Sequence, residues 1–325
     1  MTLTFGCTLQ VPGLACADVS LRGNPMFATV NPCLVGRWFS RAVLAAALTA
    51  AAAAAASAAI TLPEQKDKLA DIGRQHSTAS DLYKDFEKQA NGGQKLSFAQ
   101  MPDWTGIYTR GGIIFNFDPD QGRGAPTAKL TPEYEKRLKD KLDKRAHGIE
   151  FDYLSNCAPP GVPRWLTEPF LREFVVTPGQ TLLINEMAND IRRIYTDGRA
   201  HIPEGDRYPM YNGDSIGFWD GARLVTHTNS LRAGQYQRGQ PDYSDQVETV
   251  EIWQKMDDKT VIAHVWVYDP PSLAEPWYAK QTYTKLSDDD KRLRIRYWDC
   301  GENQNNTVIQ TDNGSSQFRD FTFDK

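Results

Sequence analysis

The 325-residue chain lacks most of the features that would assign it to a class directly. It has no excess of basic residues, since 37 Lys and Arg stand against 41 Asp and Glu and the formal charge is −4. An acidic chain offers no cationic track for phosphates, which argues against a nucleic-acid partner. The P-loop, dinucleotide-binding and H-E-x-x-H zinc motifs are also missing. We therefore expect no cofactor.

Long runs of strongly apolar residues are absent too, and the one unusual segment is rich in alanine. Between positions 42 and 59, 13 of 18 residues are Ala. The run follows two arginines and ends in Ala56-Ser57-Ala58, a small-x-small pattern that signal peptidase cleaves. Alanine is too weakly apolar to favour a membrane span of about 20 residues. We predict that residues 1–59 are a signal peptide and that the mature protein is periplasmic, without a stable membrane anchor.

Cysteine is scarce once this segment is removed. Three of the five cysteines lie within it, so that Cys157 and Cys300 remain. In an oxidising compartment an isolated pair favours one disulfide. A two-thiol metal site is the alternative, but neither cysteine has the C-x-x-C partner typical of zinc sites. The sequence leaves open a start at Met1 or Met26 and the formation of a homo-oligomer.

The rest of the chain divides into a helical segment, residues 60–100, and a β-rich domain, residues 101–325. Apolar residues recur at helical spacing between 64 and 90, which predicts one or two helices. Within the second part, Thr131-Pro132 begins a further helix that Gly148 ends. A first strand is predicted at 104–108.

From residue 173 onward the apolar period changes to two, which predicts a series of short strands joined by turns. So many consecutive strands must close into a barrel or a sandwich to avoid open edges. We predict a mainly β fold, an antiparallel up-and-down barrel of lipocalin type, with the helices outside it or across one mouth. The nine predicted strands are 173–177, 181–186, 190–196, 215–219, 223–229, 250–256, 260–268, 278–284 and 292–297.

The alternation within strand 260–268 suggests what lies inside the barrel. One face carries Val261 and every second residue to Val267, and the other carries His264, Trp266 and Tyr268. We assign the second face to the lumen, where it would line a ligand pocket. Glu248 and Glu251 fall on opposite faces of their strand, so they do not predict a paired-carboxylate site.

His227 and His264 are the candidate general bases, because imidazole titrates near neutral pH. Tyr195 is the candidate proton donor and Arg193 the candidate stabiliser of a developing oxyanion. For each histidine a structural interpretation, as a hydrogen-bonded core residue, is the somewhat stronger alternative. For Arg193 and Arg199, ion pairs that fix a turn are an equally good interpretation. No H-x-H or H-x-x-x-H pair is present, and no metal is predicted. The candidate substrate-binding residues are Trp219, Trp266, Tyr268, Trp277, Arg199 and His201.

Three blocks of sequence carry a family resemblance: residues 156–164, 191–199 (IRRIYTDGR) and 211–221 (YNGDSIGFWDG). They resemble a large group of exported bacterial β-barrel proteins common in sphingomonads and acidobacteria, over roughly residues 101–302. Where that group carries an acid after the Asp-Gly hairpin, this sequence has His227. Some exported sphingomonad proteins degrade lignin-derived aromatics, including lyases that release formaldehyde without a cofactor.

The leading hypothesis is therefore a cofactor-independent periplasmic lyase or isomerase. It would remove a proton from a hydrophobic aromatic small molecule, such as a lignin-derived dimer. The second hypothesis is a carrier protein that binds a lipophilic ligand in the same pocket without chemistry. A structural role is the third, and a lumen filled by the protein's own side chains would favour it.

Overall fold

The computed structural model describes residues 58–112, 116–120, 128–150, 152–288 and 292–300, and two short strands beyond them. The predicted signal peptide, residues 1–59, lies outside the described residues except for its last two positions. Within the described part of the chain, none of the helices has the length and apolar character needed to span a membrane.

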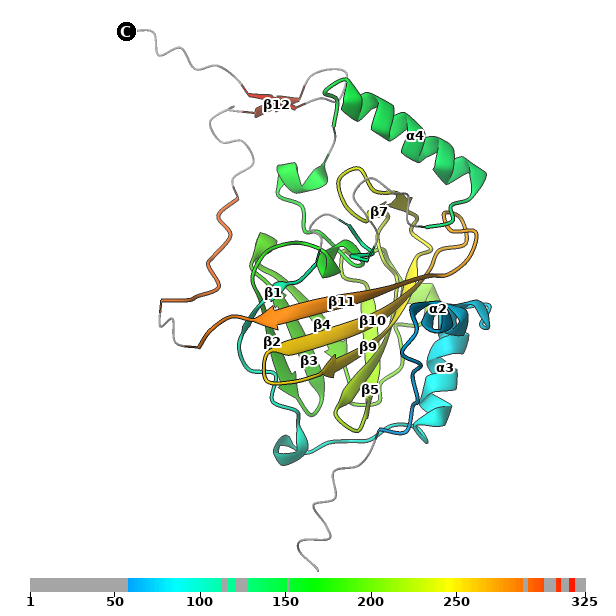
Figure 1. Cartoon of the computed structure of the whole chain (residues 1–325), viewed down its shortest axis with the longest axis vertical. Helices are drawn as coiled ribbons and strands as arrows, with labels where there is room; N and C mark the ends of the chain where they lie inside the picture. Colours follow the sequence, from blue (N-terminus) through cyan, green and yellow to red (C-terminus); the bar gives the residue numbers. More distant parts are fainter. Residues whose placement is uncertain are drawn as a thin grey trace, which may run out of the picture. The chain divides into compact units, whose positions relative to one another are not determined.

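Nine strands form a closed barrel in the order β1-β11-β10-β9-β6-β5-β4-β3-β2 (Figure 1). This confirms the predicted mainly β barrel. Eight of the nine strands match predicted ones to within about two residues at most ends, because period-two patterning marks strands directly. The strands are β1 (Ile107–Arg110), β2 (Arg172–Thr177), β3 (Gln180–Asn185), β4 (Asp190–Tyr195), β5 (Asp214–Asp220), β6 (Arg223–Asn229), β9 (Glu248–Lys255), β10 (Thr260–Tyr268) and β11 (Trp277–Lys285).

The barrel departs from a simple meander at two places. β4 and β5 pair in parallel, because the connection 196–213 carries the chain back before β5 begins, whereas a tight hairpin would reverse its direction. The predicted strand 292–297 is wrong: these residues form no strand, and β1 closes the barrel by pairing with both β2 and β11. In the described part of the chain, two further two-stranded sheets are separate from the barrel: β7 (Gly234–Gln235) with β8 (Asp242–Tyr243), and β12 (Val308–Gln310) with β13 (Ser316–Phe318).

Among the described residues, three α-helices accompany the barrel. α2 (Lys66–Arg74) and α3 (Ala79–Gln89) pack on its outer face, in contact with β6, β9, β10 and β11, as predicted (Figure 1). α3 ends where Asn91, Gly92 and Gly93 all take positive φ, a conformation that glycine adopts freely. α4 (Pro132–Ala146) begins with proline at its first position and touches β8. Single-turn 3₁₀ helices lie at Phe98–Gln100, Tyr153–Asn156, Arg164–Leu166, Met187–Asn189 and Glu204–Asp206.

The assignment of faces on β10 was wrong. Val261, Ala263, Val265 and Val267 belong to the cluster of buried side chains inside the barrel. The other face, with Trp266 and Tyr268, belongs to a second cluster between the barrel wall and helices α2 and α3. Both faces are apolar because both are covered, so the alternation alone does not say which one is the lumen.

Large side chains fill the barrel interior. Phe174 contacts Trp104, Tyr108, Trp253 and Tyr283, with ring centroids 5.0–5.9 Å apart. Trp253 is therefore inside the barrel, and the cavities described below lie outside the barrel wall.

An ion pair lies within this interior. Both nitrogens Nη1 and Nη2 of Arg192 donate to the Glu251 carboxylate, at 2.9 and 3.0 Å, and both side chains are fully buried. Thr249 Oγ1 and Trp253 Nε1 also donate to Glu251, at 2.9 and 2.7 Å. Thr228 Oγ1 accepts from Arg192 at 2.8 Å. Every strong polar group of the pair thus has a partner, as burial requires.

The predicted disulfide is confirmed. Cys157 and Cys300 are bonded, with Cα atoms 5.7 Å apart, and close a loop across 143 positions of sequence. The bond links the segment that follows the barrel to the end of the 3₁₀ turn Tyr153–Asn156. In the chain-entropy model so long a loop stabilises the fold by about 4–5 kcal/mol.

Candidate functional site

A cavity of about 590 Å³ lies on the outer face of the barrel beside His227. Its walls come from α3, from β5 and β6, and from the connection 196–213. The side chains that matter for chemistry are His201 and His227, with the cationic side chains Lys84, Lys95, Arg199 and Arg207 around them.

The two histidines belong to a chain of hydrogen bonds that begins and ends at a carboxylate. Asp214 Oδ2 lies 2.7 Å from His201 Nδ1 and also accepts the backbone N–H of Ile202 at 2.8 Å. His201 Nε2 lies 2.8 Å from His227 Nδ1. His227 Nε2 lies 3.1 Å from Glu248 Oε2, and Glu248 is about one third exposed. The order is therefore Asp214, His201, His227, Glu248.

Three complete hydrogen bonds along this chain need one proton more than two neutral imidazoles supply. Each of its three hydrogen bonds needs one proton, and ionised carboxylates only accept, so all three protons belong to the rings. Two neutral imidazoles carry two. The complete chain therefore includes one imidazolium, and loss of that proton leaves two lone pairs facing each other.

The environment indicates which ring is neutral. Burial lowers the pKa of His201, the Asp214 carboxylate opposes that shift, and the nearby charge of His227 lowers the pKa further. An extra proton is thus disfavoured on His201. Tyr83 of α3 stacks on His227 with ring centroids 5.5 Å apart, and burial raises the pKa of Tyr83, so this ring is neutral.

Strand register explains how the acids reach His227. On β5, Ile216 lies opposite His227, and on β9 Val250 does. Asp214 and Glu248 each lie two residues from those positions, on the same face of the sheet, as diagonal neighbours of His227. Sequence reasoning missed both acids, although the pairing of adjacent strands was a usable signal. His201 reaches the site from the connection 196–213, whose path no local pattern predicts.

Cations predominate around the cavity. Four Lys and Arg side chains line it, against one carboxylate, that of Glu87. Arg207 donates from Nε to the carbonyl of Ile202, and Arg199 donates to Asp197 from Nε and Nη2. Among the described residues Lys84 and Lys95 have no ion-pair partner. The cavity therefore favours a ligand with negative charge.

The other predicted polar residues are only partly at this site. Arg199 lines the cavity, and its guanidinium lies 3.9 Å from the centre of the Tyr195 ring. Arg193 is exposed on the outer face of β4, one residue from the buried Arg192, and does not line the cavity. Tyr195 is half-buried and does not line it either.

The predicted aromatic residues lie elsewhere. Trp219 and Trp277 are part of the packed barrel interior. Trp266 Nε1 donates to the carbonyl of Leu69 at 2.7 Å, and Tyr268 Oη donates to the carbonyl of Gly73 at 2.8 Å. These two side chains attach helix α2 to the barrel wall. None of the four lines the cavity beside His227.

His264 lies in a different place, at a cavity of about 370 Å³ lined also by Arg223, Tyr278 and Lys280. Its Nδ1 is 2.7 Å from the Tyr278 hydroxyl. Burial, with the charges of Lys280 and Arg223, lowers the pKa of His264 to about 4. The ring is therefore neutral at physiological pH, and the structure does not bring it together with His227.

The lowered pKa of His264 predicts a pH-dependent stability. Between pH 6.5 and 4 the unfolded chain binds a proton at this residue and the folded chain does not, so the stability present at pH 7 is lost as the pH falls. A shift to about 4 corresponds to a loss on the order of 3 kcal/mol. Urea unfolding at both pH values should show a smaller loss in His264→Gln than in wild type. An unchanged loss would contradict the assignment, and His147→Gln, an exposed histidine, is the control.

The sequence Gly213-Asp214-Ser215-Ile216-Gly217 has the spacing of a serine-hydrolase elbow, but its geometry is different. An elbow requires a turn between a strand and a helix, whereas Ser215 lies within β5. Its Oγ lies inside the barrel, 2.9 Å from Thr228 Oγ1 and 3.3 Å from Arg192 Nε. Ser215 is thus a partner of the buried ion pair and not a nucleophile.

Among the described residues, no three His, Cys, Asp or Glu side chains converge in a way that would hold a metal ion. No known protein family matches the chain, and no curated protein matches it.

Proposed function

We propose that the protein is a cofactor-independent acid–base enzyme, a lyase or isomerase, whose site is the cavity at His201 and His227. The observation that carries this proposal is the continuous chain from Asp214 through both rings to Glu248. Such a chain can pass a proton between its two carboxylates through both rings. Proton transfer by a positioned side chain contributes about 10²–10⁴-fold to a rate.

The lining of the cavity defines the substrate class. Phe218, Ile216 and Tyr83 supply apolar and aromatic wall, while the cations supply the positive charge. A small molecule with an aromatic or apolar part and an acidic group fits both. Lignin-derived aromatic acids belong to this class. The proposal therefore keeps the predicted lyase or isomerase reaction and places its site outside the barrel lumen.

A carrier without chemistry is the second candidate, and a specific observation favours it. All four imidazole nitrogens already have hydrogen-bond partners, so no lone pair is free to take a substrate proton unless Glu248 moves away. The filled barrel interior similarly favours the third candidate, a structural role.

Turnover and binding of one panel of compounds separate these candidates. The panel contains lignin-type dimers with and without a carboxylate, and mass spectrometry detects products and formaldehyde. We expect turnover confined to the compounds with an acidic group. Binding without turnover of any panel compound favours the carrier, and neither binding nor turnover favours the structural role.

We also propose that the protein is exported and cleaved after Ala58, one residue before the end of the predicted segment 1–59. The Cys157–Cys300 disulfide supports an oxidising compartment. Ala59, the first residue after the predicted cleavage pattern, donates its backbone N–H to the buried Asp220 carboxylate at 2.6 Å, and Ile60 donates at 3.1 Å. The folded domain thus holds the chain from this residue onward. After export, we expect the intact mass of the protein to match a mature chain that begins at Ala59.

A further inference from the structure

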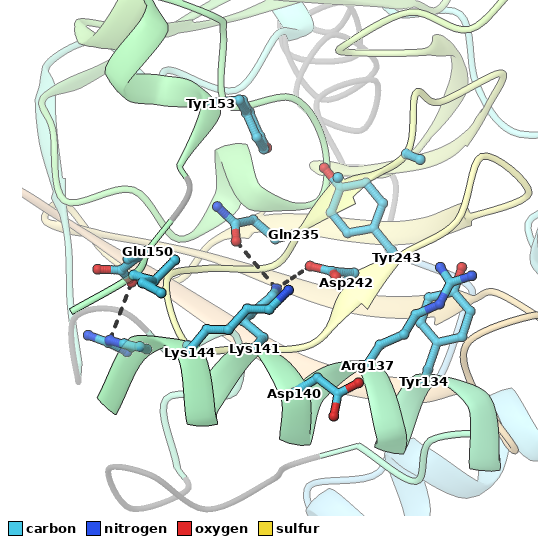
Figure 2. A pocket seen from close by; sticks show the side chains of 15 residues that line it. Tyr134, Arg137, Asp140, Lys141, Lys144, Glu150, Tyr153, Gln235, Asp242 and Tyr243 are labelled. Carbon is cyan, nitrogen blue, oxygen red and sulfur yellow. Dashed lines mark hydrogen bonds and ion pairs between the residues drawn. The ribbon is translucent and has the colours of Figure 1, made fainter. Parts of the chain in front are cut away.

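A second and larger cavity, of about 750 Å³, lies between helix α4 and the β7–β8 hairpin (Figure 2). It is separate from the site at His227 and shares no lining residue with it. α4 is attached at its start, where Thr131 Oγ1 donates to the carbonyl of Pro271 at 2.8 Å. Of the fifteen residues of α4 only Tyr134 is buried, so the helix spans the hairpin without packing tightly on it.

The face of α4 toward the cavity carries cations where a packed helix carries apolar residues. Tyr134, Arg137, Lys141, Lys144 and Arg145 line the cavity at helical spacings of three and four. That stripe on a helix usually buries Leu or Ile against the rest of the domain. Charged side chains in this stripe keep the space open, because closing it would remove them from water.

The charges on the cavity wall are only partly neutralised. Lys141 pairs with Asp242, as Figure 2 shows, and Arg145 pairs with Glu150. Lys144 has no ion-pair partner among the described residues, and in Figure 2 it extends on the same side of α4 as Lys141. The remaining lining carboxylate, that of Asp140, points away from the cavity in the same view.

Tyrosine rings form the rest of the wall. Tyr153 and Tyr243 face α4 across the cavity, and Tyr134 lies at its edge (Figure 2). Burial raises the pKa of both Tyr153 and Tyr243, so the rings are neutral. Aromatic faces beside a cation suit a planar or cyclic group with an attached anion.

We propose that this cavity binds a small carboxylic acid built on a six-membered ring, either an aromatic acid or a sugar acid. Lys144 contacts the carboxylate, and the tyrosine rings pack on the ring. The hydrogen-bonded amide of Gln235, which already accepts from Lys141 at 3.4 Å, lies on the same wall and orients polar substituents.

Calorimetric titration of the purified protein with 4-hydroxybenzoate and with glucuronate tests the proposal and separates the two ring types. We expect binding of at least one acid, and none of inorganic phosphate or benzyl alcohol, which lack the ring or the charge. Lys144→Glu should weaken binding at least tenfold. Lys136→Glu makes the same charge change on α4 at a residue that lines no cavity described here, and should weaken binding less than twofold.

Three outcomes would overturn the proposal. The first is that neither acid binds at concentrations up to about 10 mM. The second is that Lys144→Glu and Lys136→Glu weaken binding equally, which would mean that only the net charge matters. The third is that Lys84→Glu, which reverses a charge lining the cavity beside His227, abolishes binding, because that would place the ligand in the other cavity.

Discussion

Replacement of Glu251 by Leu is expected to lower the free energy of unfolding by about 3–5 kcal/mol. The change leaves Arg192 in the barrel interior with a charge that it cannot lose, since a guanidinium stays protonated at any accessible pH. It also removes the acceptor for Thr249 Oγ1 and Trp253 Nε1. Urea unfolding followed by tryptophan fluorescence measures the effect.

Two further variants separate this effect from the loss of volume or charge. Arg193→Met removes a neighbouring arginine that is exposed on the outer face of β4, and should change stability by less than about 0.5 kcal/mol. The double variant Arg192→Met with Glu251→Leu removes both charges and should recover most of the loss. A Glu251→Leu protein as stable as Arg193→Met would contradict the role of the pair. Should Glu251→Leu fail to fold, the double variant still tests it.

Replacement of His227 by Gln is expected to lower turnover by about 10²–10⁴-fold in whichever panel compound is processed. Glutamine keeps a polar group at this position but cannot pass a proton from His201 to Glu248. Ligand affinity should change far less, because the cations that line the cavity remain. His147→Gln, at the exposed end of α4, is the matched control and should leave both quantities unchanged.

The hydrogen-bond chain from Asp214 to Glu248 predicts a bell-shaped dependence of turnover on pH. At high pH the chain loses one of the three protons that its hydrogen bonds need, and turnover falls. At low pH both rings are protonated, neither can accept a proton, and turnover falls again. Because burial lowers the pKa of His201, the acid limb should lie below about pH 6.5. If the His227→Gln variant converts substrate as fast as the wild-type protein, the hydrogen-bond chain has only a structural role.

Local sequence patterns predicted the secondary structure correctly, because residues close together in the sequence decide it. The alternation in Arg223–Asn229 predicted a strand, and the structure confirms it. The same pattern misplaced the lumen at β10, since α2 and α3 cover the outer wall and make that face as apolar as the inner one. Which face is inside depends on contacts distant in sequence.

The sequence by itself determined the barrel, its flanking helices and the Cys157–Cys300 pair, because period, turn chemistry and cysteine number depend on residues close together or on a count. Only the tertiary structure brought His201 to His227, since the parallel pairing of β4 and β5 fixes the path of the connection 196–213. It also separated His264 from them and selected Arg192 over Arg193 as the buried cation. Those outcomes follow from strand register and closure of the barrel, which no short stretch of sequence records.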